Sequence, residues 1–394
     1  FIRLRPTVSA PTPNEIESHN NLSIDSILFQ IEKEVGVTPK RVPWLKGFYS
    51  LPQQCSIRKM SLFEDGLVHG IDAASGFIIH ALDPKPGESV LDLCCAPGAK
   101  LCLIADLMKR QGCLVGLDAS HQRAQSCASV LRKYGTCSPL DSNPDCTNLL
   151  EWDCSLIVAD GVAWNGEQDN RTIIWDTADD IYFSHSRYRE KKADSMSNDL
   201  EKKLPNDSEH VESTSIVKKR NLKRKINKSM RIRLKRERKS RGQKQIPTAF
   251  DKVLVDAECT HDGSIRHLRK YETEGQWGTD AFASRFLFEN DPGRGSPLKE
   301  LQRGLLLNAF RLLRPGGTLV YSTCSFCKAQ NEDVVKWLLD QSKESLGGHT
   351  AKLVEVESAK EVPATQSKDL PGCLRFEPLA SKTSGLFMAK ITKI

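Results

Sequence analysis

The stretch that decides the fold is SVLDLCCAPGAK, residues 89–100. Its first half, Val90–Leu93, is a short apolar run that predicts a buried strand, and a helix is predicted directly after the loop that follows. The pattern recurs at LVGLD, residues 114–118, and at LIVAD, residues 156–160. Strands that alternate with helices at this spacing predict a Rossmann-like α/β fold with a mostly parallel, twisted sheet.

Acidic residues end three of the predicted strands, namely Asp118, Asp160 and Asp256. The loop 94–100 holds a single glycine, Gly98, and has neither a Walker spacing nor the full G-x-G-x-x-G. Asp118 lies 20 residues beyond Gly98, the spacing at which an acid reaches ribose hydroxyls, and Asp160 could accept a hydrogen bond from an adenine amino group. A site that could hold one nucleoside but has no glycine-rich cradle for a pyrophosphate favours S-adenosylmethionine over NAD. The alternative is that each acid only caps the helix after its strand.

Two cysteines follow buried strands. YSTCS, residues 321–325, ends an apolar run introduced by a Pro-Gly turn, and Cys259 follows the run 252–258. The carboxyl ends of parallel strands meet at one edge of the sheet, where such sheets bind ligands. Cys324, Cys259 and Asp256 therefore predict covalent catalysis on a ring.

Most other cysteines need no chemical role, because a free cysteine is usually a small buried hydrophobe. Cys324 and Cys327 form a C-x-x-C, which with Cys259 and His261 could make a zinc set. We interpret Cys327 as a packing residue and predict no metal.

The chain divides into two predicted domains and one insertion. Residues 1–82 contain a strand at 1–5, a helix at 23–35, a strand at 42–49 and an apolar helix that ends at Leu82. They predict a small α+β lobe of the RNA-binding (RRM-like) type. Residues 83–394 form the predicted catalytic domain, with closing strands at 374–376 and 385–391. The polar stretch 165–247 interrupts it and is expected to be a disordered insertion.

The positive charge of the chain is local. Of its 57 lysine and arginine residues, 15 lie between Lys218 and Lys244, with one acid, Glu237. The remainder holds 42 basic and 49 acidic residues, so the overall charge of +7 says nothing about the core. The basic run is expected to be an electrostatic arm, a nuclear address or a solvated loop without function.

Composition also bears on the compartment. The 13 scattered cysteines favour a reducing, intracellular compartment over a disulfide framework. The basic run favours the nucleus or nucleolus, with the cytoplasm or an organelle as alternatives. The chain starts at Phe1 rather than Met, which predicts a fragment or a processed chain. No apolar run reaches the roughly 18 residues of a membrane span, and we expect a monomer.

These motifs together resemble the RsmB/Sun family of RNA (cytosine-5) methyltransferases, over roughly residues 40–164 and 250–394. The resemblance is carried by DLCCAPGAK at 92–100, by DAEC at 256–259 and by the long run from Gln302 to Ser325. GIDAAS at 70–75 and GLFMA at 385–389 also fit. The family's fold is that of the class I S-adenosylmethionine-dependent methyltransferases, which this resemblance implies here.

The resemblance also implies roles for individual residues. Cys324 would be the nucleophile, Cys259 the cysteine that assists product release, and Asp256 the partner of the cytosine ring. The cofactor would be held by Cys94, Cys95, Ala96, Pro97, Gly98, Ala99, Lys100, Asp118, Arg123, Asp160 and Asp256. Two departures stand out: Glu258 replaces the family's proline, and THDGS at 260–264 replaces its glycine-rich continuation.

The implied activity is formation of 5-methylcytosine in tRNA or rRNA through a covalent bond between Cys324 and carbon 6 of cytosine. The alternative is a non-catalytic RNA-binding or ribosome-assembly factor on the same fold. Retention of Cys324, Cys259 and the three strand-end acids favours the enzyme.

Overall fold

The computed structural model describes residues 1–5, 24–134, 152–166, 172–176, 246–264, 267–269, 297–345 and 348–394. The basic run 218–244 and most of the predicted insertion 165–247 lie outside these residues. Residues 1–177 and 247–394 belong to one compact unit.

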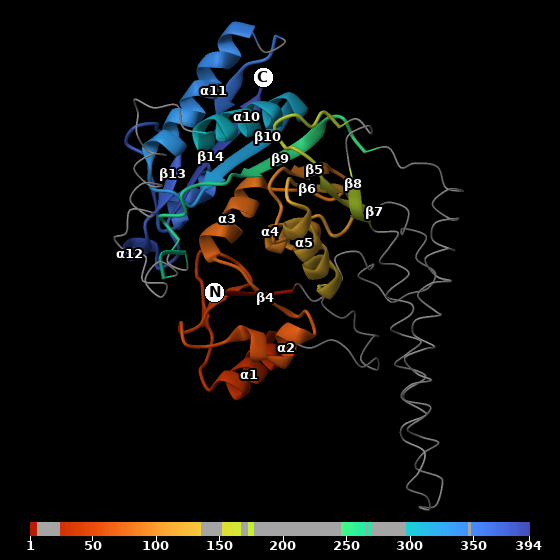
Figure 1. The fold of residues 1–394 in the computed structure, drawn as a ribbon. Helices are drawn as coiled ribbons and strands as arrows, with labels where there is room; N and C mark the ends of the chain where they lie inside the picture. Colours follow the sequence, from red (N-terminus) through yellow and green to blue (C-terminus); the bar gives the residue numbers. More distant parts are fainter. Residues whose placement is uncertain are drawn as a thin grey trace, which may run out of the picture. The chain divides into compact units, whose positions relative to one another are not determined.

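A ten-stranded sheet forms the centre of this unit (Figure 1). Its order is β12 (Ala364–Gln366), β13 (Leu374–Phe376), β14 (Leu386–Lys393), β10 (Leu313–Thr323), β9 (Phe250–Asp256), β5 (Ser89–Asp92), β6 (Gly112–Asp118), β7 (Trp152–Val158) and β8 (Thr172–Asp176), and β11 (Ala351–Leu353) pairs with β14. The five strands from β10 to β7 are parallel. The closing strands β13 and β14 are antiparallel, as the sequence predicts. The Rossmann-like α/β prediction is confirmed.

Helices cover both faces of this sheet. Figure 1 shows α3 (Ala73–Leu82), α4 (Ala99–Leu107) and α5 (His121–Lys133) on one face, and α10 (Pro297–Leu312) and α11 (Glu332–Ser345) on the other. Burial on both faces explains why β5 carries two adjacent apolar residues, Val90 and Leu91, which are both fully buried. Short helical turns complete the unit, namely η1 (Ile57–Lys59), η3 (Lys328–Gln330), η4 (Glu357–Glu361) and α12 (Pro378–Ser381).

The direction in which strands are added reverses at β5. It lies between β6, the next strand along the chain, and β9, which follows more than 150 residues later. The loops after β5 and β9 leave the sheet toward opposite faces at such a point, and this opens a crevice at the carboxyl edge. Both loops carry predicted site residues.

The N-terminal residues form a separate four-stranded antiparallel sheet with the order β2 (Lys40–Arg41), β3 (Phe48–Ser50), β1 (Ile2–Leu4) and β4 (Val68–Gly70). Helices α1 (Ile24–Val35) and α2 (Ser61–Glu64) pack on it through a small core that includes Ile2, Ile27, Ile31 and Val68. These elements lie within residues 1–82, the range predicted for the α+β lobe. The strand expected at 42–49 is wrong in its bounds, since a turn with Gly47 at φ +79° separates β2 from β3. Pro43 cannot donate to a ladder, which fits this break.

Buried polar contacts attach the lobe to the larger sheet. Arg3 Nη2 on β1 lies 2.7 Å from Asp106 Oδ2 on α4, and the two side chains are only 3% and 6% exposed. His69 stacks on Tyr134 at the end of α5, with 3.7 Å between ring centroids. Removing one partner of a buried ion pair leaves a desolvated charge, so such contacts resist opening. The lobe is therefore fixed against α4 and α5.

Strand β8 differs from the sequence expectation. It lies inside the stretch 165–247, where we expected no ordered strand, and it pairs antiparallel with β7. Its three apolar residues, Ile173 to Trp175, are flanked by polar sequence, so the run is too short to stand out. An edge strand needs only one neighbour, and β7 supplies it. None of the described helices combines the length and apolar character that crossing a membrane requires.

Candidate active site

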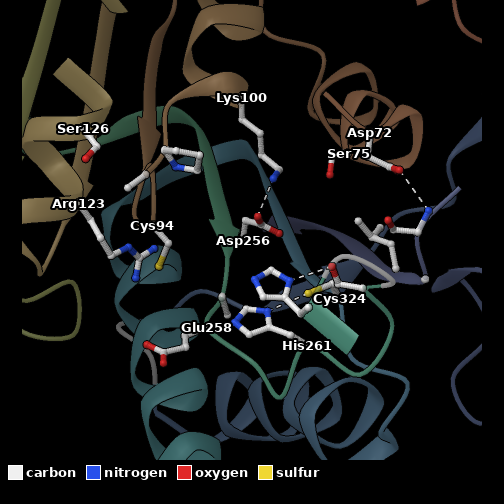
Figure 2. A pocket seen from close by; sticks show the side chains of 18 residues that line it. Asp72, Ser75, Cys94, Lys100, Arg123, Ser126, Asp256, Glu258, His261 and Cys324 are labelled. Atoms are coloured by element: carbon white, nitrogen blue, oxygen red, sulfur yellow. Dashed lines mark hydrogen bonds and ion pairs between the residues drawn. The ribbon is translucent and has the colours of Figure 1, made fainter. Parts of the chain in front are cut away.

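The parallel pairing of β9 and β10 sets the site. Ser322 lies beside Asp256 in the register, so the chain segments beyond these residues leave the sheet together. They carry Cys259 and Cys324, whose sulfur atoms lie 3.3 Å apart. The structure therefore brings together the two cysteines and the aspartate that the sequence predicts, at the carboxyl edge of the sheet. Figure 2 shows Asp256 and Cys324.

The two cysteine loops are also hydrogen-bonded to each other. The Gly263 amide donates to the carbonyl oxygen of Cys324 over 2.8 Å, and the Gly385 amide donates to the Gly263 carbonyl over 2.8 Å. A Cβ at residue 263 would lie 2.7 Å from the Cys324 oxygen, so only glycine permits this approach. Gln302 Nε2 donates to the Glu258 carbonyl over 2.8 Å, so the loop is held with Glu258 in the place of proline.

The thiols of Cys259 and Cys324 have pKa values shifted in opposite directions. The pKa of the Cys259 thiol is lowered to about 6, because Cys324 donates a hydrogen bond to it and His261 adds a second contact, and together these outweigh its burial. The pKa of Cys324 is raised by the same hydrogen bond, by burial and by the negative charges nearby. Cys324 lines the cavity, whereas Cys259 is fully buried.

Lys100 and Asp256 form an ion pair beside the sulfur atoms (Figure 2), with 2.6 Å between Nζ and Oδ2. Ser322 Oγ donates to the other carboxylate oxygen over 2.7 Å. Burial opposes the charge on Lys100, but Asp256 outweighs this effect and raises the pKa of the ammonium group. Asp256 is thus supplied with two donors, of which one carries a full charge.

The loop after β5 forms the other side of the crevice. Gly98 begins α4 with φ +103°, and a Cβ there would lie 2.8 Å from Cys127 Sγ on α5. Asp118 is 3% exposed, accepts a hydrogen bond from the Ser120 amide over 2.9 Å and pairs with Arg123 over 3.3 Å. Asp160 is exposed, and its carboxylate accepts from the Val162 amide over 2.9 Å. Its local contact is thus the turn-forming kind that the capping alternative predicts.

A cavity of about 660 Å³ joins these parts. From the predicted set, its lining includes Cys94, Ala96, Pro97, Lys100, Arg123, Asp256 and Cys324. The remaining predicted residues, Cys95, Gly98, Ala99, Asp118, Asp160 and Cys259, do not line it. Asp118 lies behind Arg123, to which it is paired.

The cavity fits a nucleoside-type cofactor together with a pyrimidine. Its volume lies within the usual range for small-molecule sites. One end offers the β5–α4 loop and the Asp118–Arg123 pair, and the other end offers Cys324 and Asp256.

Several residues that line this cavity were not predicted from the sequence. Asp72, at the N-terminus of α3, accepts a hydrogen bond from the Ser384 amide over 3.1 Å and so joins two predicted motifs. His261 and His267 also line the cavity, and their rings stack with 4.4 Å between centroids. The signal for His261 was present as a departure from the glycine-rich pattern.

Three side chains of the zinc alternative do converge. The ligating atoms of Cys259, His261 and Cys324 lie within 4.8 Å of one another. Cys327 is not part of this group, and the described residues supply no fourth side chain to it. Structural zinc sites are almost always four-coordinate, so we keep the catalytic interpretation of the three groups.

The tight fit of Gly98 leads to a prediction about cofactor affinity. We expect Gly98→Ala to lower the affinity for S-adenosylmethionine, because the loop must shift both to relieve the contact with Cys127 and to leave the left-handed backbone region. A loss of about 1–3 kcal/mol in stability should accompany it. Calorimetric titration and thermal unfolding measure the two effects, and Gly316→Ala, at an open turn with φ +77°, is the matched control. Unchanged affinity in Gly98→Ala would contradict the assignment of this loop.

Comparison with known proteins agrees with this geometry. The family model described as 16S rRNA methyltransferase RsmB/F matches residues 79–157 and 288–392, which hold the β5–α4 loop and the Cys324 loop. Over these residues the chain matches the RsmB/F methyltransferase family. The predicted resemblance is confirmed.

Relatives of this chain carry related names. The tRNA (cytosine(49)-C(5))-methyltransferase of Pyrococcus abyssi is 25% identical over 355 residues, which is 89% of this chain and 79% of the relative. The rRNA (cytosine-C(5))-methyltransferase NOP2C of Arabidopsis thaliana is 29% identical over 67% of this chain and 41% of its own length. Ribosomal RNA small subunit methyltransferase F of Klebsiella pneumoniae is 30% identical over 38% of this chain and 27% of its own length. The chain thus spans less than half of the last two relatives.

Solved structures support the fold of the chain. A methyltransferase homolog protein from Pyrococcus horikoshii has a TM-score of 0.54 at 21% identity, covering 100% of this chain and 86% of that one. The structure titled PH0851 has a TM-score of 0.58 at 22% identity, covering 99% of this chain and 58% of that one.

Proposed function

We propose that this chain is an S-adenosylmethionine-dependent RNA methyltransferase that forms 5-methylcytosine in tRNA or rRNA through a bond between Cys324 Sγ and carbon 6 of cytosine. The observation that carries the proposal is a pair of thiols 3.3 Å apart, one of which, Cys324, lines a cavity together with the ion-paired Asp256. The match to the RsmB/F family model and the names of the relatives support the reaction class.

The chemistry explains the need for these groups. Carbon 5 of cytosine is a weak nucleophile, and a thiolate that adds at carbon 6 makes it enamine-like. S-adenosylmethionine, when bound, supplies an electrophilic methyl group that carbon 5 can accept. Cys324 forms the bond to the ring, and the Lys100–Asp256 pair offers a proton-sharing contact to ring nitrogen 3. The low pKa of Cys259 suits it to take the carbon 5 proton, after which Cys324 leaves.

We also propose which residues would bind the cofactor. The β5–α4 loop, residues 94–100, would face the methionine part, with Asp118 and Arg123 at the ribose and Asp160 near the base. Cys94, Pro97 and Arg123 line the cavity and support this placement. A flipped or single-stranded cytosine can reach the Cys324 end, which favours RNA loops and unpaired segments.

Methyl transfer from tritium-labelled cofactor to total RNA tests the function. We expect label in RNA and, after bisulfite sequencing of RNA from cells with and without the gene, a cytosine whose protection from conversion depends on the gene. Binding of RNA with no transfer of label to it, under conditions where a known RNA methyltransferase is active, would favour the non-catalytic alternative.

The organisation into residues 1–82 and 83–394 is part of the same proposal, with the first lobe contacting RNA. We propose a reducing intracellular compartment, since each described cysteine is a free thiol. The basic run 218–244 favours the nucleus or nucleolus. We further propose that the protein is a monomer and that it binds no metal.

The basic run gives a prediction about salt dependence. If residues 218–244 neutralise phosphates, deleting them should reduce the slope of log Kd against log salt concentration, by roughly one for each phosphate that they neutralise. Filter binding across a salt series measures the slope. A version with the lysines and arginines replaced by glutamine keeps the length and is the matched control for loop shortening. An unchanged slope in both proteins would exclude the arm.

A further inference from the structure

His261 contacts both sulfur atoms of the site. Its Nδ1 is 3.0 Å from Cys324 Sγ and 3.5 Å from Cys259 Sγ. The shorter contact is to the sulfur that lines the cavity. An imidazole nitrogen at this distance from a thiol is the arrangement by which a base activates a cysteine nucleophile.

The backbone and neighbours of His261 hold the ring in place. Its φ is +59°, a left-handed conformation that residues other than glycine rarely adopt. The Ser264 amide donates to the His261 carbonyl over 3.0 Å, and the ring stacks on that of His267 at an interplanar angle of 15°. His267 Nδ1 in turn lies 2.8 Å from Ser264 Oγ. Strain that the surroundings maintain in this way is concentrated at active sites.

We propose that His261 is the catalytic base that takes the proton of Cys324 when this cysteine attacks the cytosine ring. The inference rests on the proposed function and adds a residue to it. The Sγ–H bond of Cys324 breaks and its proton moves to Nδ1, while the sulfur electron pair forms the bond to carbon 6. When the Sγ–carbon 6 bond breaks at the end of the reaction, its electrons return to sulfur and Nδ1 gives the proton back. The carbon 5 proton goes separately to the Cys259 thiolate and then to solvent, so the protons balance.

Assigning the Cys324 proton to His261 is consistent with the different pKa values of the two thiols. If Cys259 took the proton of Cys324, it would be neutral when the carbon 5 proton has to leave. With His261 as the first acceptor, the buried Cys259 thiolate stays available for release. The charged and titratable groups that face these atoms, and that enter any pH profile, are Lys100 on α4, Arg123 on α5, Asp72 at α3, and Asp256, Glu258, Cys259, Asp262 and His267 on or after β9.

The first test isolates the pair of His261 and Cys324 without RNA. In a Cys259→Ala background, the rate of alkylation of Cys324 by iodoacetamide is followed against pH by peptide mass spectrometry, with a chelator present. We expect half-maximal reactivity well below the pH of about 8.5 that is usual for a free thiol. Adding His261→Asn should move it toward that value and slow the reaction at pH 7 by about tenfold or more. Asparagine tolerates the left-handed backbone, so the loop should be retained.

The second test measures the reaction itself. His261→Asn should lower kcat/KM for methyl transfer by about 10²–10⁴-fold, with a changed pH profile. His261→Gly also fits the backbone, and added imidazole should partly restore its activity, which a merely structural role would not allow. His349→Asn, outside the site, is the control histidine.

The outcomes separate the two proposals. If the wild type methylates RNA while both His261 variants keep its rate and pH profile, or if alkylation of Cys324 is insensitive to His261, the inference is overturned and the function stands. If the wild type transfers no methyl group to RNA, the function fails, and the alkylation profiles still decide whether His261 activates Cys324.

Discussion

A Cys324→Ser enzyme is expected to methylate RNA about 10⁴-fold more slowly than the wild type, or worse. A serine hydroxyl fits the same space but is a far weaker nucleophile than a thiolate. The loop should survive, because Gly263 binds the backbone carbonyl of residue 324 rather than its side chain. Tritium transfer to RNA at saturating cofactor measures the effect.

Cys327→Ser is the matched control for this change. Cys327 lies three residues beyond Cys324, and burial raises the pKa of its thiol. It is not among the groups that converge on the sulfur pair, so we expect wild-type rates. If Cys324→Ser kept more than about one per cent of the activity, Cys324 could not be the nucleophile.

Replacing Cys259 should leave formation of the covalent bond intact but block release of the product. Cys259→Ala is expected to accumulate an RNA–protein adduct that survives denaturing electrophoresis, because Cys324 can add to the ring while release is blocked. The double variant, Cys324→Ser with Cys259→Ala, should form no adduct. An adduct in the double variant would place the covalent bond on another residue.

Asp256→Asn is expected to reduce methyl transfer by about 10³-fold. Asparagine keeps the size of the side chain and can still accept from Ser322 Oγ, but it removes the charge that pairs with Lys100 Nζ. Without that charge, burial lowers the pKa of the Lys100 ammonium, and the ring loses its proton-sharing partner. Steady-state kinetics and thermal unfolding separate the catalytic loss from any loss of stability.

A double-mutant cycle with Lys100→Met tests whether the two groups act as a unit. If they do, the double variant should be about as slow as Asp256→Asn alone. Ser322→Ala, which removes the other hydrogen-bond donor to the same carboxylate, is the control and should cost much less. Fully additive losses would show that Lys100 and Asp256 act independently.

The sequence alone predicted the parallel sheet and the convergence of its strand ends. The runs at 90–93, 114–118 and 252–256 are apolar because both faces of their strands are covered, and that signal is strong. The register that places Ser322 beside Asp256 could not be predicted, but any parallel pairing of these strands brings Cys259 and Cys324 to the same edge.

The features that escaped prediction depend on contacts distant in the sequence. The proton distribution in the sulfur pair follows from a 3.3 Å contact between loops 65 residues apart. From the sequence His261 looks like a turn residue, and only the folded structure shows that it lies beside Cys324. Strand β8 has three apolar residues and becomes a strand because β7 offers an open edge.

The buried contact of Arg3 with Asp106 bears on how a substrate would be chosen. A lobe that cannot swing keeps one fixed separation between the surface that would grip RNA and the sulfur that would attack it. A stem that is one turn too long or too short would then carry its cytosine past the thiol. Substrate selection would then depend mainly on the length of folded RNA between its contact with the lobe and the target cytosine. The sequence around that cytosine would matter less.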